Sequence, residues 1–353
     1  MLPTDLPTTL DRLAALGCLA DPDEANQGRL RPAGDLRALL REGAHRILDI
    51  AVWAATAGLR PVPELTRHAQ RDAGNLLGLD RSVWQERFGA VLMAPRAAAG
   101  LRWLHEARAL QLLVPEVVSM VDFHKSCPVH HKDIFDHTLQ VVEKCPPSLV
   151  VRWVALMHDA GKVWTRTVRQ GKVHFFRHEE LSASLMEGVA GRFHMEPELR
   201  DRIAWVIANH ARANVYTAQW TDSAVRRLIR DMGPYLDDVL AFSQSDYTTR
   251  RSQRIAEVRS LASQLNERIP EIAAGDAKRP ALPKGFGSLV LQETGLPPGP
   301  WLGTIQRWLE DEADAGRLER QREAPFYLAH VRAARPDLLD VNPQDARRRR
   351  PTP

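Results

Sequence analysis

The apolar run that ends in "ALMHDAGK", residues 155–162, places a histidine and an aspartate side by side. Imidazole and carboxylate groups are good ligands for divalent transition ions such as manganese, iron, nickel or zinc. Two explanations therefore compete for His158 and Asp159. They are the polar residues of an ordinary helix end, or they belong to a metal site whose other ligands lie elsewhere in the chain.

Other parts of the chain offer such ligands in a definite order. A histidine or an aspartate stands beside a helix-like apolar face at His137, His178, His210 and Asp246. Helical bundles build metal sites from side chains on facing helices, so all of these residues can point toward one bundle centre. An adjacent His-Asp pair often arises by chance, but the ordered set is more specific. We predict a metal site with the ligands His137, His158, Asp159, His178, His210 and Asp246.

Several neighbouring polar residues receive a plainer interpretation. Five further histidines are interpreted as surface residues or hydrogen-bonded core groups: His124, His130, His131, His174 and His194. Two explanations stay open for Asp133 and Asp136, which flank His137. They orient the ligand rings by hydrogen bonds, or they are carboxylates at the start of a helix.

The elements that must position the ligands are predicted to be helices. Apolar residues recur with helical rather than alternating spacing over most of the chain, including residues 35–59, 82–94 and 95–113. Only residues 165–176 are typical of a short hairpin, with "QG" at its turn. We therefore predict an all-α fold.

Two signals mark the C-terminal part of the chain. A helix over residues 221–233 has a capping residue at Thr221 or Asp222 and a glycine stop at Gly233. The Pro/Gly-rich stretch 278–288 predicts a boundary before a small helical module.

Composition limits the class of protein. The chain of 353 residues is 44% hydrophobic and 26% charged, which is typical of a soluble protein with two or three packed modules. The N-terminal segment lacks the order of a secretory signal, and the most apolar stretch, 47–59, is too short for a bilayer. Cys18, Cys127 and Cys145 show no paired spacing. We predict a reducing, cytoplasmic setting without a membrane partner.

Basic residues cluster in three places, at residues 224–230, 248–254 and 347–350, and the net charge is +4. Such clusters suit a polyanionic partner, because neutralised phosphates release counterions. They equally suit a solvated helix face. We predict that four arginines hold an RNA or nucleotide backbone beside the ions: Arg226, Arg230, Arg250 and Arg251.

The segments that carry these ligands resemble a known family. The stretches "HHKDIFDHTLQVVE", "ALMHDAGKVWTRT", "GKVHFFRHEELSASL" and "TDSAVRRLIRD" resemble the HD domain of bacterial CCA-adding tRNA nucleotidyltransferases, a metal-dependent phosphohydrolase domain. The stretches at 46–59, 82–117 and 295–318 resemble the neck, body and tail of those enzymes. The resemblance covers most of residues 35–325.

The resemblance implies an HD-domain helical bundle between two helical flanks. The expected order is a neck- and body-like region over 1–120, the HD domain over 121–277, a tail-like module over 278–340 and a disordered basic tail over 341–353. The family's nucleotidyltransferase head has a glycine-rich turn and a paired-aspartate motif. Neither occurs before residue 35, so we do not expect this chain alone to add CCA.

The resemblance also implies roles for the ligands. His137, His158, Asp159 and Asp246 would hold one divalent ion (Mn, Ni, Co, Fe or Mg), while Asp159 bridges to a second ion held by His178 and His210. One or two such ions activate water and polarise phosphoryl oxygens. Lys162 is expected to contact a phosphate oxygen or to face solvent at a helix end. Arg166 is expected to assist in the same way.

The predicted function follows from these roles. The chain would hydrolyse phosphate esters of nucleotides or RNA ends, with 2′,3′-cyclic phosphates and 2′-phosphates as first candidates. The alternative is a module that binds RNA, in particular tRNA, and partners a separate nucleotidyltransferase. Asp159, Lys162 and Arg166 are the predicted catalytic residues.

Overall fold

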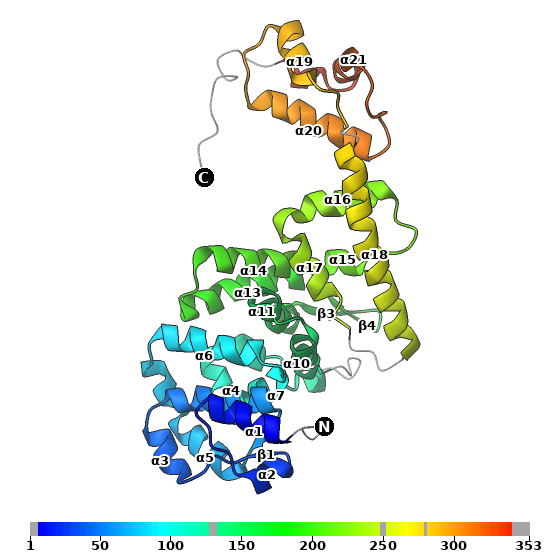
Figure 1. The fold of residues 1–353 in the computed structure, drawn as a ribbon. Coiled ribbons are helices and arrows are strands. Elements are labelled where there is room, and N and C mark those ends of the chain that lie inside the picture. Colours follow the sequence, from blue (N-terminus) through cyan, green and yellow to red (C-terminus); the bar gives the residue numbers. More distant parts are fainter. Residues whose placement is uncertain (1–5, 127–132, 248–251, 279–280, 341–353) are drawn as a thin grey trace. The chain divides into compact units, whose positions relative to one another are not determined.

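The computed structural model describes residues 6–126, 133–247, 252–278 and 281–340. It forms two compact units (Figure 1): unit 1 comprises residues 1–215 with 234–259, and unit 2 comprises residues 216–233 with 260–353. Regular structure is almost entirely helical, with two short two-stranded sheets in the described part of the chain. The predicted all-α class is confirmed. No helix among the described residues is long and apolar enough to cross a membrane.

The N-terminal part of unit 1 is a layer of short helices. Its helices are α1 (Leu6–Ala15), α2 (Pro22–Asn26), α3 (Leu36–Arg41), α4 (His45–Ala57), α5 (Pro63–Asp72), α6 (Arg81–Met93), α7 (Ala97–Glu106), α8 (Leu110–Leu113) and α9 (Pro115–Val118), with 3-10 turns η1 (Ala73–Gly78) and η2 (Phe123–Ser126). Strands β1 (Arg29–Leu30) and β2 (Arg60–Pro61) pair in parallel, which the sequence pattern did not indicate. The predicted helical segments before residue 114 are confirmed.

The second part of unit 1 surrounds one buried helix. Its elements are α10 (Ile134–Lys144), α11 (Leu149–Met157), α12 (Lys162–Thr165), β3 (Arg166–Arg169), β4 (Lys172–Phe175), α13 (His178–Phe193), α14 (Pro197–Asn209), α15 (Ala211–Asn214) and α17 (Leu236–Ser243). Helix α11 contacts α10, α13, α14 and α17, and all of its residues after Leu149 are buried. A continuous apolar run is what a helix buried on every side requires.

A buried arginine in α11 ties this helix to two neighbouring helix ends. The guanidinium of Arg152 donates hydrogen bonds to the carbonyls of Leu92 and Ala94 at the end of α6, and of Cys145 and Pro146 after α10. Carbonyls at a helix end lack partners within the helix, and a buried carbonyl without a partner is costly. Arg152 therefore fixes where α6 and α10 end against α11.

Aromatic packing joins the two parts of unit 1 into one core. Phe88 of α6 lies 5.1 Å, centroid to centroid, from Trp153 of α11 and 5.3 Å from Phe193 of α13. Trp153 and Phe193 are themselves 5.3 Å apart. This shared core explains why unit 1 continues across residue 120. The boundaries expected from the sequence, after residues 120 and 277, are therefore not the limits of the compact units, and they remain predictions.

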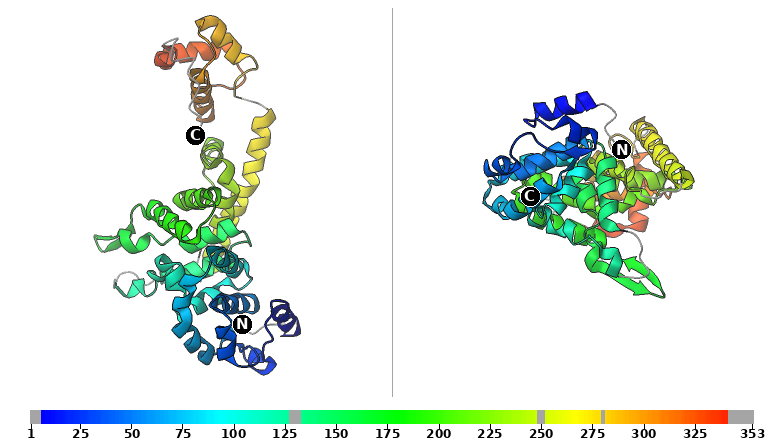
Figure 2. Two further views of the ribbon diagram at one scale, coloured as in Figure 1. Left: turned by 90° about the vertical axis from the view of Figure 1, so that its left-hand side faces the viewer. Right: turned by 90° about the horizontal axis from the view of Figure 1, so that it is seen from below.

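The predicted hairpin is present. Strands β3 and β4 pair antiparallel, with Arg169 opposite Lys172. Gln170 and Gly171 between them have positive φ values of 50° and 73°. Two positive φ values are characteristic of the tight turn that matches strand twist, and glycine accepts such a value without strain. Figure 2 (right) shows this green hairpin projecting from the helices of unit 1.

Unit 2 has its own helical core. It contains α16 (Asp222–Met232), the larger part of α18 (Ser252–Lys278), α19 (Phe286–Thr294), α20 (Pro300–Asp314) and α21 (Ala324–Ala334), with η4 (Pro336–Leu338); the turn η3 (Gly233–Tyr235) follows α16. The apolar side chains of α19, α20 and α21 form one cluster around Phe286, Ile305 and Tyr327. The predicted caps of α16 are confirmed, since the Thr221 hydroxyl accepts from the Ala224 N–H and the helix ends at Gly233.

Candidate metal centre

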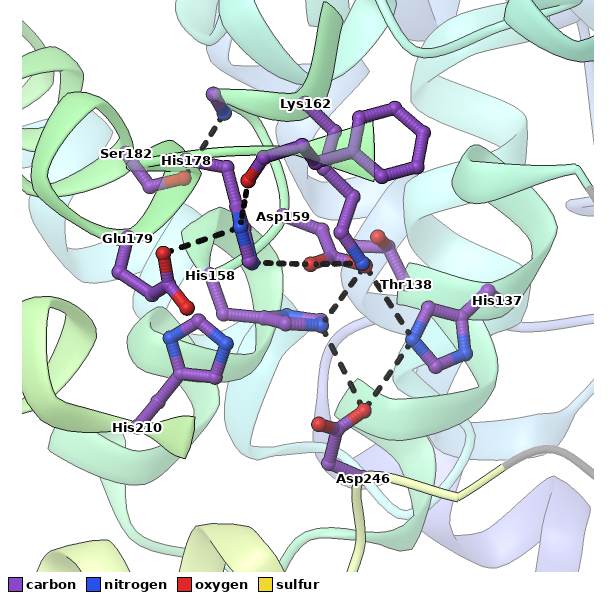
Figure 3. A network of polar contacts seen from close by, with 12 residues as sticks. His137, Thr138, His158, Asp159, Lys162, His178, Glu179, Ser182, His210 and Asp246 are labelled. Atoms are coloured by element: carbon purple, nitrogen blue, oxygen red, sulfur yellow. Dashed lines mark hydrogen bonds and ion pairs between the residues drawn. The ribbon is translucent and has the colours of Figure 1, made fainter. Parts of the chain in front are cut away.

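Six ionisable side chains converge inside unit 1 (Figure 3). They come from α10 (His137), the residues that follow α11 (His158, Asp159), the start of α13 (His178), the residue after α14 (His210) and the segment after α17 (Asp246). These are the six ligands that the sequence predicts. They form two groups, His137 with His158 and Asp246, and Asp159 with His178 and His210. Within each group one potential ligand atom per residue lies within 4.8 Å of the others.

Helix ends explain why this place favours a cation. Helices α11, α14 and α17 all end at the centre, where His158, His210 and Asp246 follow their last turns. The C-terminal end of a helix carries partial negative charge, equivalent to about half an elementary charge, and stabilises cations. Three helix ends and two carboxylates therefore all stabilise positive charge at the centre.

Asp159 lies between the two groups. Its Oδ2 is 3.3 Å from Nε2 of His158 and 3.6 Å from Nε2 of His137, while its Oδ1 is 3.6 Å from Nε2 of His178. Asp246 completes the first group, with Oδ1 3.3 Å from Nε2 of His137 and 3.7 Å from Nε2 of His158. One carboxylate thus presents a different oxygen to each group, which is the arrangement of a bridging ligand.

These separations fit ligands of a common ion. Two donors that each lie about 2.1 Å from one ion are roughly 3.0–3.4 Å apart at coordination angles of 90–109°. The four separations between carboxylate oxygens and the Nε2 atoms of the first group are 3.3, 3.3, 3.6 and 3.7 Å. Two lie within this range, and two exceed it by a few tenths of an ångström. In addition, the buried Nε2 of His158 has no hydrogen-bond partner in the described chain. A buried polar atom without a partner is rare and costly, so the donor set fits a divalent ion.

Backbone carbonyls orient the histidine rings. Nδ1 of His158 lies 2.9 Å from the carbonyl oxygen of Ala155, Nδ1 of His178 lies 2.9 Å from that of Phe175, and Nδ1 of His210 lies 2.7 Å from that of Ile207. Because a carbonyl only accepts, each Nδ1 carries the proton and donates. This leaves the Nε2 lone pair for a metal, as in many metal sites.

Burial and mutual charge set the ionisation of the centre. Burial lowers the pKa of His210 to about 4, so its ring is neutral at neutral pH. Burial works against the charged forms of Asp159 and His158, but their attraction for each other outweighs it. The pKa of Asp159 is held well below its usual value and the pKa of His158 is raised. Burial also opposes the charge of Asp246, whose pKa is nevertheless lowered by the hydrogen bond from His137 and the charge of His158.

Lys162 is held by the bridging carboxylate. Its Nζ lies 2.7 Å from Oδ1 and 2.8 Å from Oδ2 of Asp159, and 5.5 Å from the ring centroid of Phe175. The side chain is 24% exposed, so its ammonium group is not sealed from solvent. The lysine therefore belongs to the centre; its contact with a phosphate oxygen stays a prediction.

Arg166 makes structural contacts. Its guanidinium donates to the hydroxyl of Ser126 over 2.8 Å and lies 4.3 Å from the ring centroid of Phe123. These contacts tie the start of β3 to the turn η2. The predicted phosphate contact of Arg166 would have to compete with them, and it stays a prediction.

Gly161 allows the start of α13 to reach the centre. A Cβ atom at this position would lie 2.4 Å from the carbonyl oxygen of His178 and 2.9 Å from the backbone nitrogen of Ser182. The Gly161 N–H instead donates to the Ser182 hydroxyl over 2.8 Å. The glycine after the His-Asp pair is therefore required by this close approach, which brings His178 into the second group.

Three residues that the sequence did not single out support the ligands. Oε2 of Glu179 lies 3.1 Å from Nδ1 of His178, and Nδ2 of Asn214 donates to Oδ2 of Asp246 over 3.1 Å. The ring of Phe242 lies 5.1 Å from that of His158. Glu179 follows its ligand directly in the sequence, which is a detectable signal. No local pattern connects Asn214 with Asp246.

The other predicted residues lie in different surroundings. Asp133 caps α10 by accepting from the Asp136 N–H, and Asp136 pairs with Arg102 at 2.7 Å, as expected for carboxylates at a helix start. Arg226 and Arg230 belong to unit 2. Nε of Arg226 is 2.7 Å from Oδ2 of Asp276, and Arg230 pairs with Asp311.

Two predicted substrate contacts, Arg250 and Arg251, lie outside the described residues. The proposed role of all four arginines stays a prediction.

The segment that carries the centre is similar to known proteins. Residues 134–251 match the HD domain family and contain all six residues of the centre. The chain is 26% identical over 303 residues to the A-adding tRNA nucleotidyltransferase of Deinococcus radiodurans, covering 82% of this chain and 68% of that protein. It is 27% identical over 258 residues to the CC-adding tRNA nucleotidyltransferase of Thermus thermophilus, covering 71% of this chain and 57% of that protein.

A solved structure shows the same fold. The crystal structure of the Bacillus stearothermophilus CCA-adding enzyme in complex with CTP has a TM-score of 0.52 and 14% sequence identity, covering 90% of this chain and 69% of that chain. The predicted resemblance to the HD region of CCA-adding enzymes and its helical flanks is therefore confirmed. The chain spans little more than half to about two thirds of these relatives.

Proposed function

We propose that this protein, whose residues 134–251 match the HD domain family, is a metal-dependent phosphohydrolase acting on nucleotide or RNA-end phosphate esters. The preferred substrates are 2′,3′-cyclic phosphodiesters and 2′-phosphomonoesters. The observation that supports the proposal most is the Asp159 carboxylate, which presents one oxygen to each of two groups of metal-ligating side chains. A protein without metal chemistry has no need of this arrangement.

Each residue of the centre has a proposed role. His137, His158 and Asp246 would hold one divalent ion with Asp159, while His178 and His210 would hold a second ion through the other oxygen of Asp159. When bound, the ions would supply an acidified water and Lewis acidity toward the phosphoryl group. Mn, Ni, Co, Fe and Mg are all candidates, because imidazole and carboxylate ligands accept each of them to some degree.

The chain's own side chains would manage charge and orientation. Carbonyl hydrogen bonds keep the rings of His158, His178 and His210 in the form that can bind a cation. Lys162 would turn its partly exposed ammonium group from Asp159 toward a phosphate oxygen when the ions take over the neutralisation of that carboxylate. This would lower the cost of bringing an anionic ester to the centre.

The proposal is tested with purified protein supplied with Mn²⁺, Ni²⁺ or Co²⁺. Hydrolysis of 2′,3′-cyclic nucleotides, 2′-nucleotides and a generic phosphatase ester is measured for the wild type and for Asp159→Ala. We expect metal-dependent turnover that Asp159→Ala loses. The proposal is wrong if no metal supports turnover, or if Asp159→Ala retains it.

A second candidate is an RNA-binding module that partners a separate nucleotidyltransferase. The observation in its favour is that the similarity to two tRNA nucleotidyltransferases extends over 71–82% of the chain, well beyond the HD domain. The metal content of the purified protein distinguishes the two. A protein that binds tRNA tightly but takes up no divalent ion at the centre would favour the module.

A further inference from the structure

The hairpin β3–β4 adjoins the metal centre and concentrates positive charge. Residues 160–178 contain five lysines and arginines and no acidic residue. The hairpin leads directly to the second ligand group, because the carbonyl oxygen of Phe175 in β4 accepts the hydrogen bond from His178. The sequence indicated this hairpin and assigned a function only to Arg166 at its start.

The strand pairing sorts the hairpin side chains onto two faces. Side chains alternate between the faces of a strand, so residues opposite one another share a face. Thr167 lies opposite His174, and Arg169 lies opposite Lys172. Arg169, Lys172 and His174 therefore share one face, which we call the basic face, whereas Val168 and Val173 lie on the other.

The basic face also carries an aromatic surface. The rings of His174 and Phe176 stack with centroids 5.1 Å apart and planes 6° from parallel, which puts Phe176 on the same face. The Arg169 guanidinium lies 5.5 Å from the centroid of Phe176. Phe176 is nonetheless 55% exposed, so it gains little of the roughly 2 kcal/mol that burying such a side chain contributes.

The exposed apolar groups gather in this part of the chain. Three of the nine large hydrophobic side chains that are exposed in the described chain lie between residues 164 and 176. Cations that track phosphates, next to a ring on which a base can stack, are what proteins use to bind single-stranded nucleic acid. The absence of acidic residues between 160 and 178 disfavours a basic or mixed-charge protein partner.

We infer that the basic face of the β3–β4 hairpin (Arg169, Lys172, His174 and Phe176) binds a single RNA strand whose terminal phosphate enters the metal centre. A base stacks on the ring pair of His174 and Phe176, and Arg169 and Lys172 neutralise the adjoining phosphates. His178 follows Phe176 by two positions in the chain, a backbone span of about 7 Å, so the basic face begins close to the second ligand group. The inference deepens the proposed function and relies on it for the role of the terminal phosphate.

Strand binding can be tested without turnover. The full chain is titrated into a 5′-fluorescein-labelled octaribonucleotide in EDTA, and fluorescence anisotropy is followed at several salt concentrations. Phe176→Ala should weaken binding by about fivefold or more, the lower end of what losing one base–aromatic stack costs. The double variant Arg169→Gln/Lys172→Gln should reduce the salt slope by about 1.4, since each lost phosphate contact on a single strand removes about 0.7.

Val168→Ala is the matched control. Val168 is 54% exposed on the opposite face of the same strand, so this variant should bind the octamer like the wild type. The inference is overturned if Phe176→Ala and the double variant bind normally, or if Val168→Ala loses as much affinity as Phe176→Ala. It is also overturned if 3:1 phosphatidylcholine–phosphatidylserine vesicles bind the basic face more tightly than the octamer does.

The outcome separates this inference from the proposed function. If the wild type binds the octamer through the basic face but hydrolyses no ester with any metal, the proposed function fails and the binding face stands. If the wild type hydrolyses phosphate esters but the variants of the basic face bind the octamer normally, the binding face fails and the proposed function stands.

Discussion

The metal centre of unit 1 and the arginine-rich helix α16 of unit 2 both gather ionisable side chains, but they differ in how these are compensated. The ligands of the centre are spread from His137 to Asp246 along the chain, and the buried Nε2 of His158 has no hydrogen-bond partner in the described chain. Arg226 and Arg230 stand four residues apart in one helix, and each is paired with a carboxylate.

This difference in compensation distinguishes a candidate binding site from residues that stabilise the fold. Donor atoms that converge and leave a buried atom without a hydrogen-bond partner support the bound ion that we propose. Basic residues that stand close in sequence and already have carboxylate partners stabilise the protein's own structure first. Any RNA contact of Arg226 or Arg230 would have to break an existing ion pair. Convergence in space is thus stronger evidence for function than clustering in the sequence.

The largest effect is expected from Asp159→Asn, which keeps the size of the side chain but removes its charge. Both ligand groups lose their shared carboxylate, so metal content should fall below detection and kcat/KM by about 10³-fold or more. Elemental analysis and ester hydrolysis measure the two quantities. A variant that keeps its metal and its turnover would show that the centre is not the site of catalysis.

A smaller but selective effect is expected from Gly161→Ala. The added methyl group meets backbone atoms of His178 and Ser182, so the start of α13 must shift and the second ligand group opens. Overpacking of this kind costs about 1–3 kcal/mol of unfolding free energy. Denaturant unfolding and metal affinity report the loss.

Gly191→Ala is the matched control, because Gly191 lies in α13, the helix whose start Gly161 contacts, and has open space around it. Alanine at an open helical position should leave stability equal or raise it by up to about 1 kcal/mol. Equal losses in Gly161→Ala and Gly191→Ala would show that the close contact at Gly161 is not what makes its variant unstable.

Asn214→Ala tests a side chain that holds a ligand without binding metal. Its amide donates to Oδ2 of Asp246, which leaves Oδ1 for the ion. Removing such a partner typically lowers metal affinity by about 10- to 100-fold. Competition with a fluorescent chelator measures the affinity. Unchanged affinity would mean that the segment after α17 orients Asp246 by itself.

The smallest effect is expected from Arg226→Gln. The pair with Asp276 is partly exposed, so its loss should cost about 0.5–1 kcal/mol of unfolding free energy and leave metal content unchanged. Arg227→Gln, an exposed neighbour in the same helix, should cost less. If Arg226→Gln loses RNA affinity but keeps full stability, Arg226 serves RNA binding rather than the fold, and α16 is a binding surface.

The local elements could be predicted because their signals are local. The caps of α16 at Thr221 and Gly233 and the turn of the hairpin at Gly171 depend on side chains and backbone preferences within a few residues. The order of histidines and aspartates likewise identified all six residues that converge at the centre. Residue type and order suffice for this because few side chains can bind a divalent ion.

The tertiary structure decided the contacts between segments that are distant in the sequence. The split of the Asp159 oxygens between two groups, the support of Asp246 by Asn214 and the close approach at Gly161 depend on how α11, α13, α15 and α17 pack. The continuity of unit 1 across residue 120 likewise follows from the aromatic core of Phe88, Trp153 and Phe193 rather than from composition. The sequence alone determined which side chains could bind a metal, because that is a property of each side chain. Which oxygen faces which histidine was decided only by packing, because close-packed helices leave each side chain few positions.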